Sequence, residues 1–146
     1  MQQDFSIALE NALKTLKASD RFESEVRARL HRFSPDVIDA VVLHLRTKGI
    51  LNDVRTASAV VSRRTGSRAV GRERLITELE RKGADAAVIE GALPDSGEER
   101  ERLRTLLQSK FSPLDDRAKA GRFLYSRGFS TEDIDSELDA FFGGHE

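Results

Sequence analysis

Hydrophobic residues recur along the chain at the spacing of amphipathic helices. The first three stripes are Phe5, Leu9, Ala12, Leu13 and Leu16; Phe22, Val26, Leu30 and Phe33; and Val37, Ile38, Val41, Val42 and Leu45. Each stripe places its apolar side chains three or four residues apart, which gathers them on one helical face. No stretch of useful length alternates with the period of two that marks a strand. The pattern therefore predicts an all-α protein.

Helix boundary signals agree with this prediction. Ser34-Pro35 has the form of an N-cap followed by a proline at the first helical position. Ser130 with Asp133 and Ser96 with Glu99 have the spacing of capping boxes. The expected helix stops are glycines that follow a basic residue, at Lys48-Gly49, Lys82-Gly83 and Arg127-Gly128.

Grouping the helices in threes reveals a repeat. Leu79–Gly83 precedes the helix that carries Ile89, and Leu124–Gly128 precedes the helix that carries Ile134 in the same way. The sequence predicts an elongated array of three tandem three-helix repeats, at residues 4–48, 49–94 and 95–143. Units this small bury little apolar surface alone, so neighbouring repeats should share contacts. Flexible segments are expected at residues 49–53, 64–71 and 94–97.

Composition argues against catalysis. The chain has no cysteine, which excludes disulfides and thiolate chemistry. His31, His44 and His145 lack metal-ligand spacing, and glycine-rich phosphate motifs are absent. We therefore expect a protein that is not an enzyme and has neither a metal nor another cofactor. Residues 1–10 do not resemble a signal peptide, and no apolar stretch has membrane-spanning length, so a cytoplasmic location without membrane contact is expected.

The net charge of −1 hides a strong segregation along the chain. Basic residues outnumber acidic ones by eight to three in residues 54–82 and again in 100–128, whereas 83–99 and the segment from 129 onward carry only acidic charges. One interpretation of this segregation is that the charged residues lie on solvated helix faces and form ion pairs within the protein. The other is a basic surface for an acidic partner, because arginine binds carboxylates and phosphates through two parallel bonds. The candidate partner-binding residues are Arg63, Arg64, Arg68, Arg72, Arg74, Arg117, Lys119, Arg122 and Arg127.

Individual positions carry further expectations. Asp53 is expected to cap the helix that follows it, with a partner contact as the alternative. Phe33 and Phe129 follow helix ends and are expected to pack in the core. Tyr125, the only tyrosine, fits either the basic face or half-buried packing. Gly91 and Gly121 should each cost up to about 1 kcal/mol relative to alanine if they lie inside helices.

The order of several motifs resembles the RecX family of recombination regulators. The motifs are Gly49-Ile50-Leu51-Asn52-Asp53 with Ala57; Gly71-Arg72-Glu73-Arg74-Leu75 with Leu79 and Lys82-Gly83; and Lys110-Phe111 followed by Arg127-Gly128-Phe129-Ser130 and Ile134. The sequence departs from the family pattern at Ile50 and Thr56, where aromatic residues are usual. The resemblance extends over residues 8–142, nearly the whole chain.

The resemblance implies a regulator, mainly an inhibitor, that lies in the groove of the RecA filament on single-stranded DNA. It also implies that the protein slows ATP hydrolysis, strand exchange and RecA-dependent repressor cleavage during DNA repair and recombination. We expect a monomer with at most weak direct affinity for DNA. One alternative is a helical protein that binds DNA directly without a recombinase partner. Another is a helical scaffold for an unrelated partner.

Overall fold

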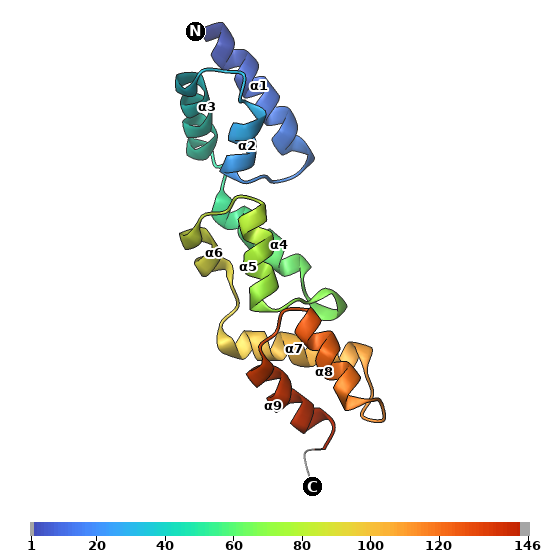
Figure 1. The fold of residues 1–146 in the computed structure, drawn as a ribbon. Helices are drawn as coiled ribbons and strands as arrows, with labels where there is room; N and C mark the ends of the chain where they lie inside the picture. The colour runs from blue at the N-terminus through green and yellow to red at the C-terminus, as the bar shows by residue number, and fades with distance from the viewer. Residues whose placement is uncertain (1, 144–146) are drawn as a thin grey trace. The chain divides into compact units, whose positions relative to one another are not determined.

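The computed structural model describes residues 2–143, and the regular elements in that range are all helical. They are α1 (Gln2–Ala18), α2 (Glu23–Arg29), α3 (Pro35–Thr47), α4 (Asp53–Arg63), the 3-10 turn η1 (Gly66–Arg68), α5 (Arg72–Arg81), α6 (Ala86–Ala92), α7 (Ser96–Lys110), α8 (Arg117–Ser126) and α9 (Thr131–Phe141) (Figure 1). The predicted all-α class is confirmed. None of these helices, over the residues described, is long and apolar enough to cross a bilayer.

The chain divides into two compact units that interleave along the sequence. The first unit combines the residues up to Ser58 with Leu79–Gly91, and the second combines Ala59–Glu78 with the residues from Ala92 onward. Helices α4 and α5 each contribute residues to both units. This division follows spatial contacts, whereas the three repeats follow sequence similarity, and their boundaries at 4–48, 49–94 and 95–143 stay a prediction.

The core of the first unit lies between α1, α2 and α3, which pack against one another. Its buried side chains are those of Ala8, Ala12, Val26, Leu30, Val37, Val41, Val42, Leu45 and Leu51. The Ser34 hydroxyl accepts a hydrogen bond from the Val37 amide at 3.3 Å, and Pro35 begins α3, as predicted. Phe33 is half-buried and packs against this core. Leu51 brings the segment after α3 into the same core, so the expected flexible segment at 49–53 is anchored there.

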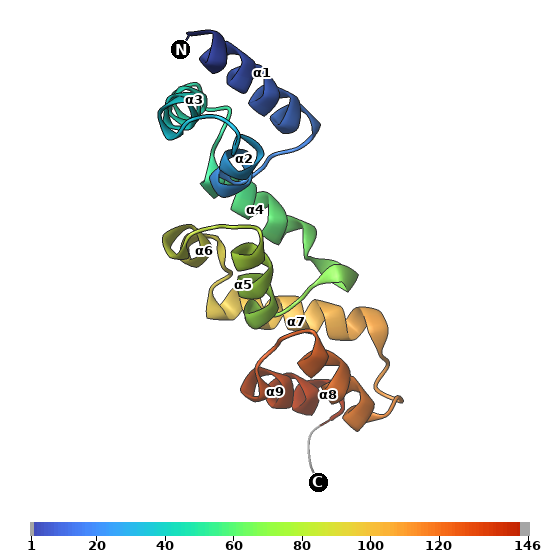
Figure 2. The ribbon, with the colours of Figure 1, turned by 45° about the horizontal axis from the view of Figure 1, so that its top comes forward.

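The core of the second unit is centred on α7, against which η1, α8 and α9 pack (Figure 2). Its buried side chains are those of Ala69, Leu103, Leu106, Leu107, Ala120, Leu124, Phe129, Ile134 and Leu138. Phe129 is therefore a core residue, as predicted. The expectation of a flexible segment at 64–71 is wrong at its C-terminal end. Ala69 is small enough to enter the core fully, and the Gly71 amide donates to the Arg127 carbonyl at 2.7 Å.

Most helix ends agree with the sequence. Gly49, Gly83 and Gly128 have φ values of 73°, 93° and 91°, the left-handed conformation of a helix stop. The Ser130 hydroxyl accepts a hydrogen bond from the Asp133 amide at 3.2 Å and caps α9.

Two predicted caps are wrong by one residue. Asp95, not Ser96, caps α7, and it exchanges hydrogen bonds with Glu98 at 2.8 and 3.1 Å. The bond from the Glu98 amide lowers the pKa of the Asp95 carboxyl. Asn52 caps α4 through a 3.1 Å bond from the Arg55 amide, and this leaves Asp53 as the first helical residue. In both places two candidate caps are adjacent in the sequence, and the first of the two is the one that caps the helix. The carboxylates predicted to cap these helices, Asp53 and Glu99, accept hydrogen bonds from the amides of Glu23 and Arg72 instead.

Candidate functional site

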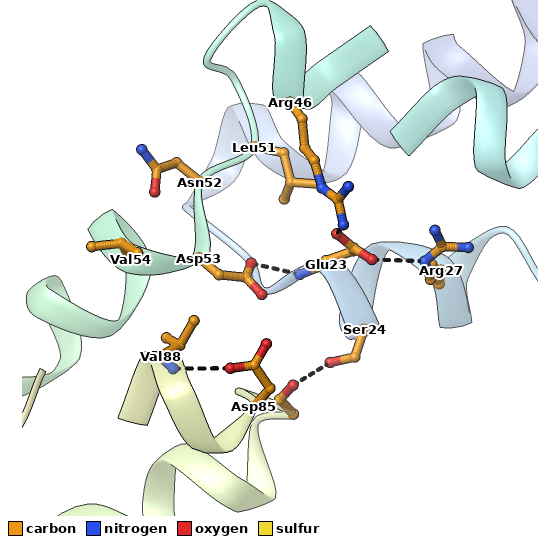
Figure 3. Close-up of a pocket in the computed structure, with 11 residues that line it drawn as sticks. Glu23, Ser24, Arg27, Arg46, Leu51, Asn52, Asp53, Val54, Asp85 and Val88 are labelled. Carbon is orange, nitrogen blue, oxygen red and sulfur yellow. Dashed lines mark hydrogen bonds and ion pairs between the residues drawn. The ribbon is translucent and has the colours of Figure 1, made fainter. Parts of the chain in front are cut away.

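A polar pocket of about 520 Å³ opens in the first unit where α2, α4 and α6 begin and α3 ends (Figure 3). The motif that ends in Asp53 and the helix stop at Gly83 both contribute to its lining. Within the described residues, no three histidine, aspartate or glutamate side chains lie close enough together to hold a metal ion. His145 lies outside the described residues.

The pocket is bounded by hydrogen bonds that join distant segments. Asp53 Oδ1 accepts a bond from the Glu23 amide at 2.8 Å, and the Ser24 hydroxyl donates to the Gly83 carbonyl at 3.1 Å. A Cβ on Gly83 would lie 2.9 Å from Ser24 Cβ and closer still to its hydroxyl, so glycine is required there. Burial raises the pKa of Asp53, and the Glu23 amide opposes that shift. The Glu23 amide belongs to the first turn of α2 and has no partner within its own helix.

The Glu23 carboxylate is neutralised by two arginines. Arg27 Nε donates to it at 3.0 Å, and Arg46 pairs with its other oxygen. Arg27 also binds Asp39 at 2.8 Å, and these bonds raise the pKa of the Arg27 guanidinium, the one to Asp39 most. The motif residues in this pocket therefore have structural partners already. We interpret the pocket as a joint between helices of the first unit.

The second unit contains a joint of the same design. Glu99 Oε2 accepts a hydrogen bond of 2.6 Å from the amide of Arg72, which is the first residue of α5. Gly128 again adopts a positive φ, and a Cβ there would lie 3.0 Å from both the backbone nitrogen and the Cβ of Arg74. Burial raises the pKa of Glu99, and the bond from the Arg72 amide opposes that shift. In both units, a carboxylate thus accepts a hydrogen bond from the first amide of a helix that lies earlier in the sequence. The glycine that ends another helix packs against the first turn of that same helix.

Five of the nine predicted binding residues take part in internal contacts of the second unit. Arg64 pairs with Glu78, Arg72 reaches the Pro94 carbonyl, Arg74 reaches the Ser126 carbonyl, Arg117 pairs with Asp139, and Arg127 donates to the Ser67 and Ala69 carbonyls. Arg127 also lies over the Phe123 ring, 4.7 Å from its centroid. These five side chains therefore stabilise the folded chain. Whether they also contact a partner stays a prediction.

The other four predicted residues are Arg63, Arg68, Lys119 and Arg122. All four are exposed. Their side chains make no hydrogen bond or ion pair with any residue that the structure describes. We refer to these four residues as the unpaired basic set. It is the part of the predicted basic surface whose charges are available to a partner.

Sequence patterns did not reveal how α7 and α9 neutralise each other. Glu137 of α9 is only 4% exposed and accepts bonds from Arg104 at 2.8 Å and Arg100 at 3.2 Å, both from α7. Its bond with Arg104 lowers the pKa of the Glu137 carboxyl and raises that of Arg104. Part of the basic run at 100–128 is thereby neutralised by the acidic segment that follows it. Ion pairs within one helix can be recognised by their i, i+4 spacing, whereas contacts between two helices have no such spacing in the sequence.

Replacing Glu137 with glutamine is expected to destabilise the protein in a pH-dependent way. The free energy of unfolding should fall by about 1–2 kcal/mol at pH 7. The loss is moderate because the two arginines are partly solvated, and glutamine can still accept a hydrogen bond from them, although a weaker one without charge. The pKa of Glu137 is lower in the folded protein than in the unfolded chain. The stability that its carboxylate contributes is therefore fully present above the unfolded-state pKa and is lost as the pH falls through the folded-state pKa. Urea unfolding of both proteins should therefore give converging stabilities in acid. A difference that stays constant down to pH 2 would contradict this account.

The chain is similar to known regulatory proteins. A family model described as RecX, third three-helix domain, matches residues 98–138. The chain is 38% identical over 128 residues to the regulatory protein RecX of Leptothrix cholodnii, covering 83% of this chain and 80% of that protein. It is 36% identical over 120 residues to the regulatory protein RecX of Pseudomonas savastanoi pv. phaseolicola, covering 78% and 77%. These matches define a regulatory protein with a three-helix domain at residues 98–138.

The chain belongs to the RecX family. The fold agrees with this assignment. The crystal structure of RecX from Lactobacillus salivarius superposes with a TM-score of 0.83 at 24% identity, covering 97% of this chain and 98% of that one. The resemblance seen in the sequence motifs is therefore confirmed.

Proposed function

We propose that this protein regulates the RecA recombinase, mainly as an inhibitor, by binding the RecA filament on single-stranded DNA. Membership of a regulatory family supports the role of regulator. The observation that carries the proposal is the unpaired basic set, Arg63, Arg68, Lys119 and Arg122 in the second unit. A recombinase filament offers both carboxylates and DNA phosphates to such cations.

The proposed action is binding without catalysis, by a monomer in the cytoplasm. Contact with the filament would hold recombinase subunits in a less active arrangement and slow ATP hydrolysis, strand exchange and repressor cleavage. A ligand shifts such an equilibrium only if it binds one arrangement more tightly than the other. The polar joints in both units suit this role, because they fix the helix starts and so limit the cost of ordering the protein on binding.

A titration of RecA ATPase on single-stranded DNA tests the proposal. Increasing amounts of the protein should slow ATP hydrolysis at or below one protein per recombinase. A parallel measurement of binding to DNA alone identifies direct DNA binding as the alternative. Unchanged ATP hydrolysis, strand exchange and repressor cleavage at saturating protein would overturn the proposal. Tight, steeply salt-dependent binding to bare DNA would favour the direct binder instead.

Charge reversal at Arg63 and Arg68 is expected to weaken inhibition. Because both side chains are exposed and unpaired within the described residues, Arg63→Glu with Arg68→Glu should leave helical circular dichroism unchanged. The protein concentration needed for half-inhibition should rise about tenfold or more, since two charge-assisted contacts become repulsive. This pair is a cleaner probe than Arg72 and Arg74, whose side chains also support the fold.

The matched control reverses Arg81 and Lys82, two exposed residues at the end of α5 and just beyond it. It changes the net charge by the same amount outside the unpaired basic set. Equal loss of inhibition in both double variants would show that overall charge, and not this surface, governs binding. Undiminished inhibition by the Arg63 and Arg68 variant would exclude these two residues as contacts.

A further inference from the structure

An open groove of about 680 Å³ runs along the second unit between α8 and α9. The buried side chains of Ile134 and Leu138 of α9, with Gly121 of α8, line the groove and are called its floor. The exposed residues Ala118 and Tyr125 of α8 also line it and are called one wall. The groove is separate from the polar joint at Glu99 and from the ion pairs of Glu137. Its lining is mostly apolar although it opens to solvent, which is typical of surfaces that bind a partner.

Gly121 brings the two helices close together. A Cβ at this position would lie 3.3 Å from Leu138 Cδ1, closer than most side-chain contacts. The bare backbone of α8 therefore remains part of the groove floor. Tyr125 lies one turn further along α8 and is 66% exposed. A largely exposed aromatic ring beside an apolar floor provides contact area at small entropic cost, because tyrosine has only two side-chain torsions.

The two walls of the groove carry opposite charges. Arg122 lies on the α8 side and Asp135 on the α9 side, and both line the groove. Both are exposed, and neither side chain has a hydrogen bond or ion pair with any described residue. Arg117, which also lines the groove, is already paired with Asp139. The available charge is therefore one cation on one wall and one anion on the other.

We propose that this groove binds an amphipathic helix of the recombinase. The apolar stripe of that helix would fill the groove, with a carboxylate facing Arg122 and a basic side chain facing Asp135. Amphipathic helices commonly bind apolar grooves in this way, and the charges on the two walls fix which flank faces which helix. The inference rests on the proposed function. It adds to the unpaired basic set a second surface that would contact the recombinase, and Arg122 is the one residue that belongs to both.

Filling the groove tests the inference directly. Ala118 is exposed and lines the wall, so the indole of Ala118→Trp would occupy the groove without burial in the core. The variant should bind RecA filaments on single-stranded DNA at least tenfold more weakly. Ala140→Trp is the matched control, because Ala140 is exposed on α9 and does not line the groove. It should bind within about twofold of the unsubstituted protein.

Reversing the anionic wall separates the groove from simple charge attraction. If only a basic surface attracted an acidic polymer, Asp135→Lys would strengthen binding. The groove inference predicts weaker binding, because the new lysine would face a basic side chain. Asp135 is exposed, so this variant keeps the inference testable even if Ala118→Trp fails to fold. Unchanged or stronger binding by Asp135→Lys would overturn the inference.

The only tyrosine gives an independent readout of groove occupancy. Fluorotyrosine labelling of the full chain places a single fluorine probe at Tyr125. Its resonance should shift or broaden strongly with RecA-coated DNA in the unsubstituted protein and much less in Ala118→Trp. If the unsubstituted protein binds filaments but both Ala118→Trp and Asp135→Lys bind equally well, only the groove inference fails. If the unsubstituted protein ignores filaments, the proposed function fails and the groove inference fails with it.

Discussion

Alanine in place of Gly71 is expected to destabilise the second unit by about 3 kcal/mol or more. The added Cβ would lie 2.5 Å from the Phe129 amide nitrogen and closer still to the Gly128 carbonyl. Both are backbone groups in the joint after α8, so neither can move aside as the end of a flexible side chain would. Relief of the clash would separate Gly71 from the Arg127 carbonyl and break their 2.7 Å hydrogen bond.

Gly91→Ala is the matched control for Gly71→Ala. Gly91 lies in α6, and a Cβ there would meet nothing within 4 Å. Alanine should therefore stabilise the protein by up to about 1 kcal/mol, through its better helix propensity. Urea unfolding followed by circular dichroism measures both variants. A Gly71→Ala protein as stable as the unsubstituted chain would show that the joint is not tightly packed.

Local signals in the sequence predicted the elements well because local physics determines them. Ser34 and Ser130 cap their helices as predicted, and Gly49, Gly83 and Gly128 end theirs. In these places the amide and its partner lie within a few residues, so the pattern contains both. The expectation for Tyr125 stayed open between two environments, and the structure places it at the exposed groove.

Contacts between distant segments could not be predicted in the same way. Nothing near Asp53 indicates that its carboxylate accepts from the Glu23 amide. Likewise, Glu99 fits a capping box by spacing, yet it binds the Arg72 amide from another helix. A carboxylate can satisfy any nearby donor, and which donor is nearest depends on how the helices pack.

The same limitation affected the predicted basic surface. Charge segregation indicated cations available for a partner, but the structure divides the predicted set. Arg74 and Arg127 bind backbone carbonyls, whereas Arg63 and Arg122 do not pair with any described residue. Sequence charge counts treat all four alike. Only the packing of each arginine against neighbouring segments distinguishes a structural arginine from one that a filament can contact.

Leu103→Ala is expected to destabilise the second unit by about 2–5 kcal/mol. Leu103 is fully buried in α7, the helix against which η1, α8 and α9 all pack. Removing its side-chain atoms beyond Cβ loses apolar burial and leaves a cavity among several elements. Leu114→Ala is the control, because Leu114 belongs to the same unit but is 96% exposed, and its loss should change stability by less than about 0.5 kcal/mol.

Hydrogen exchange of Leu103→Ala would show how far this loss extends. Ala59–Glu78 belongs to the second unit, as does α7. The amides at 73–78 should therefore lose protection from exchange together with those of α9. The Arg72 amide bonds to Glu99, four residues before Leu103 on α7, which gives a direct route for this coupling. Loss of protection confined to residues 95–143 would instead favour the third sequence repeat as the cooperative unit. The experiment thus decides whether spatial contacts or sequence repeats define how the protein unfolds.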